Sequence, residues 1–317
     1  MLQQLYIRFA LTLLISTLPG ESYVSTSNLR NSFKPLSIAS RAKSPLFSTK
    51  FLTVDEDRVA VFGGTGGVGE LITIGLRETG YRACPIARSA PRKDEQGRGL
   101  NLVDASVEDI IVALADCQGV VIATGTTAFP TARWKGGNTP ENIDLKATEK
   151  ILAAIKLINS ERGVDDPSRI KKVLLLTSIG TNRRGDFPFI ILNLFGVLDA
   201  KRASEENLMR AAKEANFSYV ICRPGRLIGG PYTNLDLAAL FKIESRVEDG
   251  GVTIEEGDTL IGDCSRDRAA MASVMALING VAADIDFAIV DDDDSESLSR
   301  DDWGEEYGCL AGLDCKY

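Results

Sequence analysis

Residues 62–70 read FGGTGGVGE, and five of these nine residues are glycine. Each glycine loses much backbone entropy on folding, so such a run is kept where another group must approach the main chain closely. The apolar run at residues 58–63 predicts a buried strand, and residues 68–78 have the apolar spacing of a helix. A glycine-rich loop between a strand and a helix predicts a binding site for the pyrophosphate of a dinucleotide.

The three glycines of the G-x-x-G-x-x-G spacing have separate roles in this interpretation. Gly63 makes the tight turn out of the strand, Gly66 leaves room for the pyrophosphate, and Gly69 lets the helix pack on the sheet. Free N–H groups at the helix N-terminus supply a partial positive charge for the phosphates. The predicted contacts in this loop are Gly63, Thr65, Gly66, Gly67, Val68 and Gly69.

The residue after the second predicted strand indicates which dinucleotide is bound. Residues 82–87 form that strand, and Arg88 follows it. NAD-specific sites place Asp or Glu here to hold the ribose 2′-hydroxyl, whereas a guanidinium pairs with a 2′-phosphate. NADP(H) is therefore predicted over NAD(H). Asp104 ends a third predicted strand at residues 100–104 and is a candidate acceptor for the adenine amine. The alternative is that Asp104 caps the next helix.

Strands and helices alternate through the rest of the chain. Further strands are predicted at residues 119–123, 172–178, 218–223 and 286–290, and helices at 107–115, 141–156, 199–215 and 301–309. This alternation predicts an α/β fold with one doubly wound, mostly parallel Rossmann sheet and helices on both faces. Residues 51–317 are assigned to this NAD(P)-binding domain, and residues 225–317 are expected on its substrate side.

Several stretches beyond the glycine loop point to a family. They are GGTGGVG at 63–69, ATGTTAFP at 123–130, Arg133-Trp134, NTPE at 138–141, NLFGVL at 193–198 and RPGRLIGGPYTNLDL at 223–237. Through them the chain resembles the NmrA-like branch of the atypical short-chain dehydrogenase/reductase superfamily. More narrowly, it resembles the plastid-targeted NAD(P)-binding Rossmann-fold proteins of plants and algae. The resemblance implies that Ala123, Thr124 and Gly125 line the cofactor and that Pro224 lies beside the nicotinamide, but it supplies no reaction.

The resemblance also implies which residues would carry out chemistry. Short-chain dehydrogenases use a Ser and a Tyr-x-x-x-Lys motif, in which the Tyr is the acid/base and the Lys binds the ribose. Ser178 and Lys201 stand where the Ser and Lys belong, but Val197 replaces the Tyr and cannot transfer a proton. Lys201 is then either a catalytic acid or only a ribose donor, and Ser178 is either catalytic or a polar end to its strand. Tyr219 and Tyr232 are the other candidate phenols.

The first fifty residues differ in composition from the rest. They contain six Lys or Arg and one acidic residue, Glu21. Residues 9–18 form an apolar run of signal-peptide length, too short to span a bilayer, and a stretch rich in Ser, Thr and basic residues follows. A signal-like segment before a transit-like one is similar to the leaders of algal plastids. Residues 1–50 are therefore predicted to be a plastid-targeting leader outside the fold, with a mitochondrial leader as the alternative.

Composition excludes several other classes of function. The chain has no histidine and a formal net charge of -8, which argue against His-based catalysis and against nucleic acid as a partner. None of the six cysteines has a CxxC spacing, so no metal site is predicted. Cys309 and Cys315 are candidates for a redox disulfide, although two free thiols are the simpler interpretation. No transmembrane span is expected in the mature chain. The apolar residues 187–198 are expected to pack in the core, with a pocket wall, a subunit contact or a thylakoid contact as alternatives.

Two functions from different classes fit these observations. The first is a plastid NADPH-dependent oxidoreductase that acts on a small apolar or pigment-like molecule. The second is a non-enzymatic NADP(H)-binding redox sensor, or an assembly factor for a photosynthetic complex with a plastid protein as partner. Val197 favours the second function. The glycine loop, Arg88, Ser178 and Lys201 support cofactor binding in both.

Overall fold

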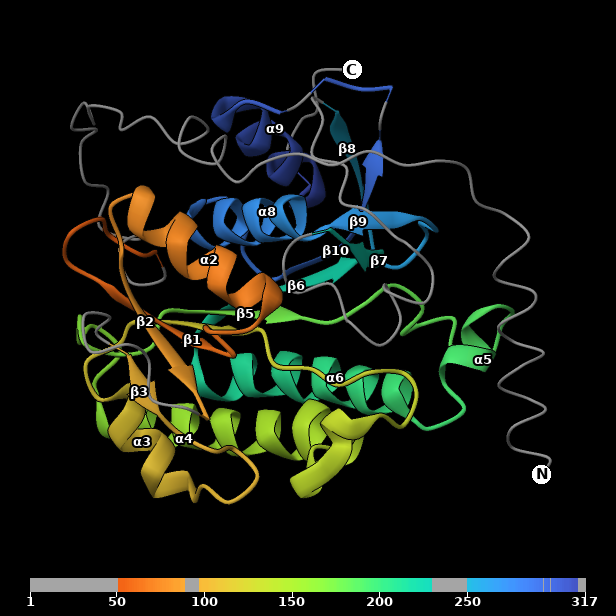
Figure 1. The fold of residues 1–317 in the computed structure, drawn as a ribbon. Coiled ribbons are helices and arrows are strands. Elements are labelled where there is room, and N and C mark those ends of the chain that lie inside the picture. The colour runs from red at the N-terminus through yellow and green to blue at the C-terminus, as the bar shows by residue number, and fades with distance from the viewer. Residues whose placement is uncertain (1–50, 89–96, 230–249, 293, 297, 313–317) are drawn as a thin grey trace.

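Most strands lie in one large sheet of the order β3-β2-β1-β4-β5-β6-β10-β8 (Figure 1). The computed structural model describes residues 51–88, 97–229, 250–292, 294–296 and 298–312. The strands of this sheet are β1 (Arg58–Phe62), β2 (Arg82–Ala87), β3 (Arg98–Gly99), β4 (Gly119–Ile122), β5 (Lys172–Leu176), β6 (Ser218–Pro224), β8 (Gly251–Glu256) and β10 (Ile285–Asp292). Its neighbouring strands are parallel except for β10 and β8, which are antiparallel. A short second sheet pairs β7 (Arg226–Ile228) with β9 (Asp263–Ser265). The predicted doubly wound, mostly parallel fold is confirmed.

Helices cover both faces of the large sheet (Figure 1). α2, α8 and α9 pack on one face, and α3, α4 and α6 pack on the other. The helices are α2 (Gly67–Glu78), α3 (Val107–Leu114), α4 (Ala147–Glu161), α5 (Phe189–Leu192), α6 (Val197–Ala215), α8 (Arg266–Ile278) and α9 (Arg300–Leu310), with a 3₁₀ segment η2 (Ala132–Gly137) and a π-helix η3 (Pro140–Lys146). Along β1, Val59 and Val61 face one core, and Ala60 and Phe62 face the other. Burial on both faces explains why the strands are continuous apolar runs.

The third strand does not lie where the sequence predicts it. β3 is Arg98–Gly99, and the chain beyond it forms a turn instead of continuing in the sheet. The backbone N–H groups of Asp104 and Ala105 both donate to the Asn101 carbonyl oxygen, at 3.1 and 2.8 Å. These bonds close the turn, so the prediction of a strand at residues 100–104 is wrong.

Sequence patterns did not indicate α8, β7, β8 or β9. α8 is buried along most of its length and is rich in small residues, so it lacks the single apolar stripe of a surface helix. The π-helix η3 and α4 together replace the one helix predicted at residues 141–156. The remaining predicted strands and helices are present with boundaries shifted by at most a few residues.

The apolar segment at residues 187–198 is only partly core. Phe189 and Val197 are buried, whereas Phe187 is 73% exposed, Leu194 57% and Ile190 49%. The prediction that this segment packs wholly in the core is therefore wrong for its exposed side. Within the described ranges, no helix combines the length and the apolarity needed to cross a bilayer.

One cysteine near the C-terminus is oxidised. Cys309 is disulfide-bonded, so free thiols were the wrong interpretation for this residue. Its candidate partner from the sequence, Cys315, lies outside the described residues. The thiols at 84, 117, 222 and 264 are free and buried.

A buried ion pair fixes α6 against the ends of β5 and β6. Arg223 on β6 is 1% exposed and donates to both carboxylate oxygens of Glu205, at 2.9 and 3.0 Å. Thr177, just after β5, donates its hydroxyl to the same carboxylate at 2.7 Å. Burial alone would lower the pKa of Arg223, but hydrogen bonds and charge from Glu205 and Asp286 raise it above its usual value. Four hydrogen bonds from the Arg223 guanidinium, two of them to Glu205, offset the cost of burying this pair.

A buried lysine generates a prediction about stability. Lys172 on β5 donates to the carbonyl oxygens of Ala276 and Asn279 at the end of α8, at 2.7 and 2.8 Å. Burial lowers the pKa of Lys172 to about 7, and a neutral amine still has the two N–H groups that these bonds use. In the unfolded chain the pKa is about 10.4, so between pH 7 and 10 the unfolded state binds more protons and stability rises with pH, by up to about 1.4 kcal/mol per unit.

Urea unfolding of the wild type and Lys172→Met from pH 7 to 9.5 tests this. The free energy of unfolding of the wild type, minus that of the variant, should increase as the pH rises. Lys156→Met, at an exposed position on α4, is the control and should follow the wild type. A constant difference between the wild type and Lys172→Met across this range would contradict the prediction.

Candidate functional site

The glycine loop packs against the end of β4, where the strand order reverses direction from β1. Gly63 has φ +79°, and a Cβ there would lie 2.8 Å from the carbonyl oxygen of Ala123. The N–H of Ala123 donates to the Phe62 carbonyl at 3.0 Å, which places Ala123 and Thr124 directly beside the loop. A Cβ on Gly69 would lie only 2.2 Å from the Gly63 carbonyl oxygen. Ligands of open α/β sheets bind at such a switch point, outside the carboxyl ends of the strands.

Free space and unused donors at this loop fit a pyrophosphate. Within 4 Å a Cβ on Gly66 would meet only the Gly63 carbonyl oxygen, at 3.3 Å, so the outer side of Gly66 is open. α2 starts at Gly67 without a side-chain cap, which leaves its first N–H groups for a ligand. Thr65 is exposed, whereas Val68 is buried and can offer only its N–H. The buried hydroxyl of Thr124 has no hydrogen-bond partner in the described part of the chain, and a bound ligand would supply one.

A second cluster forms where η3, α6 and the loop after β4 meet. The ammonium of Lys201 lies 2.7 Å from Oδ1 of Asp144, whose side chain is 1% exposed. The other carboxylate oxygen, Oδ2, accepts the backbone N–H of Thr126 at 3.1 Å and also its hydroxyl. A Cβ on Gly125 would lie 3.2 Å from the Lys201 ammonium. Gly125 and Lys201, which were both predicted to bind the cofactor, thus lie side by side.

Asp144 was not predicted from the sequence. It lies on the π-helix η3, and such helices are frequent at functional sites. A usable signal was its spacing from Thr148 and Ile151, which are both buried. An acidic residue in line with the buried face of a helix requires an opposite charge nearby, and Lys201 provides it.

The other candidates for chemistry lie at the ends of β5 and β6. Ser178 is half-buried, two residues beyond β5, and Pro224 is the last residue of β6. The N–H of Ile179 donates to the Pro224 carbonyl at 3.1 Å and joins these two ends. Val197 is the first residue of α6 and is 3% exposed, in an apolar cluster with Ile179 and Phe189. The position of the missing tyrosine is therefore a packed core position.

Two predicted residues lie at the β2–β3 side of the site. Arg88 is exposed, one residue beyond β2. Asp104 is exposed in the turn after β3 and accepts the side-chain amide of Asn101 at 2.5 Å. The N-terminal cap of α3 is Ser106, which accepts the N–H of Asp109 at 3.1 Å, so the alternative role of Asp104 as that cap is wrong.

The remaining candidate phenols are Tyr219 and Tyr232. Tyr219 is half-buried within β6, and burial raises the pKa of its hydroxyl. Tyr232 lies outside the described residues.

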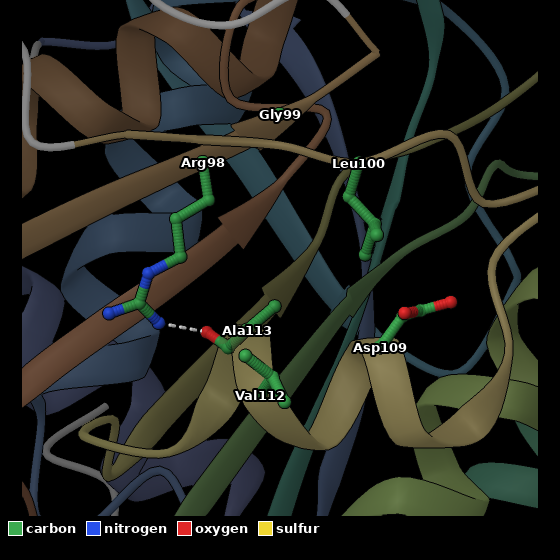
Figure 2. A pocket seen from close by; sticks show the side chains of 6 residues that line it. All are labelled: Arg98, Gly99, Leu100, Asp109, Val112 and Ala113. Carbon is green, nitrogen blue, oxygen red and sulfur yellow. Dashed lines mark hydrogen bonds between the residues drawn. The ribbon is translucent and has the colours of Figure 1, made fainter.

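A hollow at the edge of the sheet is separate from these residues. Figure 2 shows it between β3 and α3, with Arg98 reaching the carbonyl of Ala113 across one end. Its lining is Arg98, Gly99, Leu100, Asp109, Val112 and Ala113, which includes none of the predicted cofactor residues.

Comparisons with known proteins agree with this geometry. Residues 63–276 match a family model described as NAD(P)H-binding. The chain is 31% identical over 228 residues to the chloroplastic protein TIC 62 of Oryza sativa subsp. japonica, covering 65% of this chain and 42% of that protein. It is 30% identical over 199 residues to TIC 62 of Arabidopsis thaliana, covering 56% of this chain and 28% of that protein. The chain thus spans less than half the length of these relatives.

Solved structures share the fold at low identity. A putative NAD-dependent epimerase/dehydratase from Bacillus halodurans has a TM-score of 0.57 at 19% identity, covering 80% of this chain and 100% of that one. The oxidoreductase ylbE from Lactococcus lactis also has a TM-score of 0.57, at 18% identity, covering 78% of this chain and 95% of that one. A wide-type short-chain dehydrogenase/reductase from Veillonella parvula, in complex with NADP, has a TM-score of 0.50 at 14% identity, covering 77% and 99%.

The glycine geometry separates a binding defect from a folding defect. Gly66→Val should abolish dinucleotide binding and leave the melting temperature near that of the wild type, because its side chain extends into the open phosphate path. Gly69→Ala should instead lower the free energy of unfolding, by roughly 1–3 kcal/mol, because its Cβ meets backbone.

Fluorescence titration with reduced cofactor and thermal unfolding measure the two effects. Gly163→Val, at a loop glycine with nothing within 4 Å, is the control and should change neither. Wild-type affinity in a folded Gly66→Val protein would exclude this loop as the pyrophosphate site.

Proposed function

Because this chain belongs to the NAD(P)H-binding family, within the NmrA-like atypical short-chain dehydrogenases/reductases, we propose that it binds NADP(H) and is an oxidoreductase. The observation that carries the proposal is the convergence of the glycine loop, the end of β4 and the Lys201–Asp144 pair at the strand-order switch point. Its proposed substrate is a small apolar or pigment-like molecule. The adenosine 2′-phosphate is assigned to Arg88, and the pyrophosphate to the loop from Gly63 to Gly69.

Lys201 is the charged group at the reacting end of the proposed site. When bound, NADPH supplies a hydride to an electrophilic carbon of the substrate, and the substrate also takes up one proton. An ammonium has three N–H donors, and its ion pair with the single Asp144 oxygen Oδ1 leaves at least two of them for a ligand. These donors are proposed to hold the cofactor ribose, or a substrate oxygen beside it. Ser178 at the end of β5 is proposed as a second donor to that oxygen.

The ion pair bears on how Lys201 acts. If Lys201 gave up its proton, the buried carboxylate of Asp144 would be left without a compensating charge, which is strongly unfavourable. Lys201 is therefore better suited to donate hydrogen bonds throughout the reaction, with water as the final proton source. This argument favours the ribose-donor role of Lys201 over the role of catalytic acid.

The second candidate function is a non-enzymatic NADP(H)-binding sensor or assembly factor. Val197 favours it, because a buried valine occupies the place of the catalytic phenol. The TIC 62 relatives are chloroplastic proteins, and more than half of their length lies outside the part that matches this chain. Their location, together with the basic, hydroxyl-rich composition of residues 1–50, supports a plastid location for this protein.

Arg88 leads to a prediction about cofactor choice. The wild type should bind NADPH at least tenfold tighter than NADH, and Arg88→Asp should weaken NADPH binding roughly ten- to hundredfold, because one charge-assisted contact with the 2′-phosphate is lost. Fluorescence titration with both cofactors measures this. Arg82→Asp, at the exposed opposite end of β2, changes the net charge equally and should have little effect. Equal affinity of the wild type for the two cofactors would remove the assignment of Arg88.

The Lys201–Asp144 pair separates the two functions. The double variant Lys201→Met/Asp144→Asn removes both charges without leaving one buried alone. If the protein is an enzyme, the variant should lower turnover by roughly 10²–10³-fold, the usual loss when a hydrogen-bond donor to a reacting oxygen is removed. If it is a sensor, the wild type should turn over no ketone, enone or tetrapyrrole, and the variant should only bind NADPH more weakly. NADPH oxidation across such a panel is the measurement. Equal turnover by both proteins would exclude the pair from the mechanism.

A further inference from the structure

A single lysine on α4 holds the turn that follows β3. The ammonium of Lys150 donates to the backbone carbonyl oxygens of Leu102, Val103 and Ala105, at 3.1, 3.0 and 2.8 Å. An ammonium has three N–H donors, so these three carbonyls use its whole capacity. The lysine is 45 to 48 residues away from them in the chain.

The shape of the turn depends on that cation. Three carbonyl dipoles that converge on one point repel one another unless a positive charge lies between them. The N–H bonds within the turn go to Asn101, and they close it without satisfying these carbonyls. Without the ammonium, residues 102–105 would therefore have to rotate their peptide groups toward water.

The turn lies at the adenosine side of the proposed site. Directly before it, the N–H of Leu100 donates at 2.7 Å to the carbonyl of Ala87, the residue next to Arg88. On its other side, a methyl carbon of Val103 lies 3.3 Å from the position of a Cβ on Gly137, in the segment after β4. The turn therefore bridges the end of β2 and the loop beyond β4, and it carries Asp104.

We propose that Lys150 is a positioning residue for the adenosine half of the cofactor: its ammonium keeps residues 101–105 in the shape that receives the adenine and its ribose. The inference rests on the proposed NADP(H) function. It assigns Lys150 no contact with the cofactor itself, because its N–H donors are already used by the turn.

The experiment compares Lys150→Met with Lys156→Met, whose lysine lies on the same helix and pairs with Glu214 near the surface. The probes are NADPH and adenosine 2′,5′-bisphosphate, which lacks the nicotinamide. Lys150→Met should bind both about tenfold more weakly, and Lys156→Met should bind them like the wild type. Wild-type affinity of Lys150→Met for adenosine 2′,5′-bisphosphate would overturn the proposal. If the wild type binds neither probe, the proposed function fails instead.

Chemical rescue distinguishes positioning of the turn from a general loss of structure. In Lys150→Ala, methylammonium should restore affinity for adenosine 2′,5′-bisphosphate, because it brings back both the charge and N–H donors. Tetramethylammonium has the same charge and no N–H, so at equal concentration it should not. Rescue by both cations, or by neither in a protein that remains folded, would show that the three carbonyl bonds do not set the affinity. If Lys150→Met does not fold, Lys150→Arg takes its place. Wild-type affinity of Lys150→Arg together with lost affinity of Lys150→Ala would support the proposal, and wild-type affinity of both variants would overturn it.

Discussion

Glu205 has no exposed surface, and its carboxylate joins α6 to the ends of β5 and β6 through Arg223 and Thr177. A buried carboxylate without its donors is strongly unfavourable, so these contacts form together or not at all. Lys201 lies four residues earlier on the same face of α6, and its ammonium forms an ion pair at 2.7 Å with the buried carboxylate of Asp144. Two ion pairs on one helix face, each with a buried carboxylate, thus set both the depth and the rotation of α6. The position of the Lys201 ammonium beside Gly125 follows from that constraint.

The sequence was most informative where one local cause determines the structure. Strands buried on both faces must be continuous apolar runs, and the glycine loop must be free of side chains where Gly69 meets Gly63. It was least informative where the cause lies elsewhere in the chain. Asp144 and Lys201 are 57 residues apart in the chain. α8 is rich in small residues because other helices cover it. The turn at residues 101–105 had an apolar pattern suited to a strand, but the ammonium of Lys150 and the Asn101 carbonyl hold its backbone instead.

The two ends of the site are built from different kinds of support. At the glycine loop, close packing of main chain on main chain sets the geometry, as between Gly63 and Ala123. At the Lys201 end, the charge pair between Lys201 on α6 and Asp144 on η3 does so, together with the Thr126 N–H that donates to Asp144. Main-chain packing changes little when side chains are substituted, whereas a charge pair depends on both partners. Cofactor binding is therefore the more robust property of this architecture, and chemistry at its far end is the more easily altered one.

The burial of Val197 also limits how this chain can evolve. Its neighbours Ile179, Phe189 and Ala288 fill the space around it, so a larger ring at this position would need several of them to shrink at once. A substitution that placed a phenol at this position would disrupt the core before any gain in activity. Val197 is thus held in place by the side chains packed around it. Descendants of this sequence would reach a new activity more readily through the surface loops around the site than by reversal.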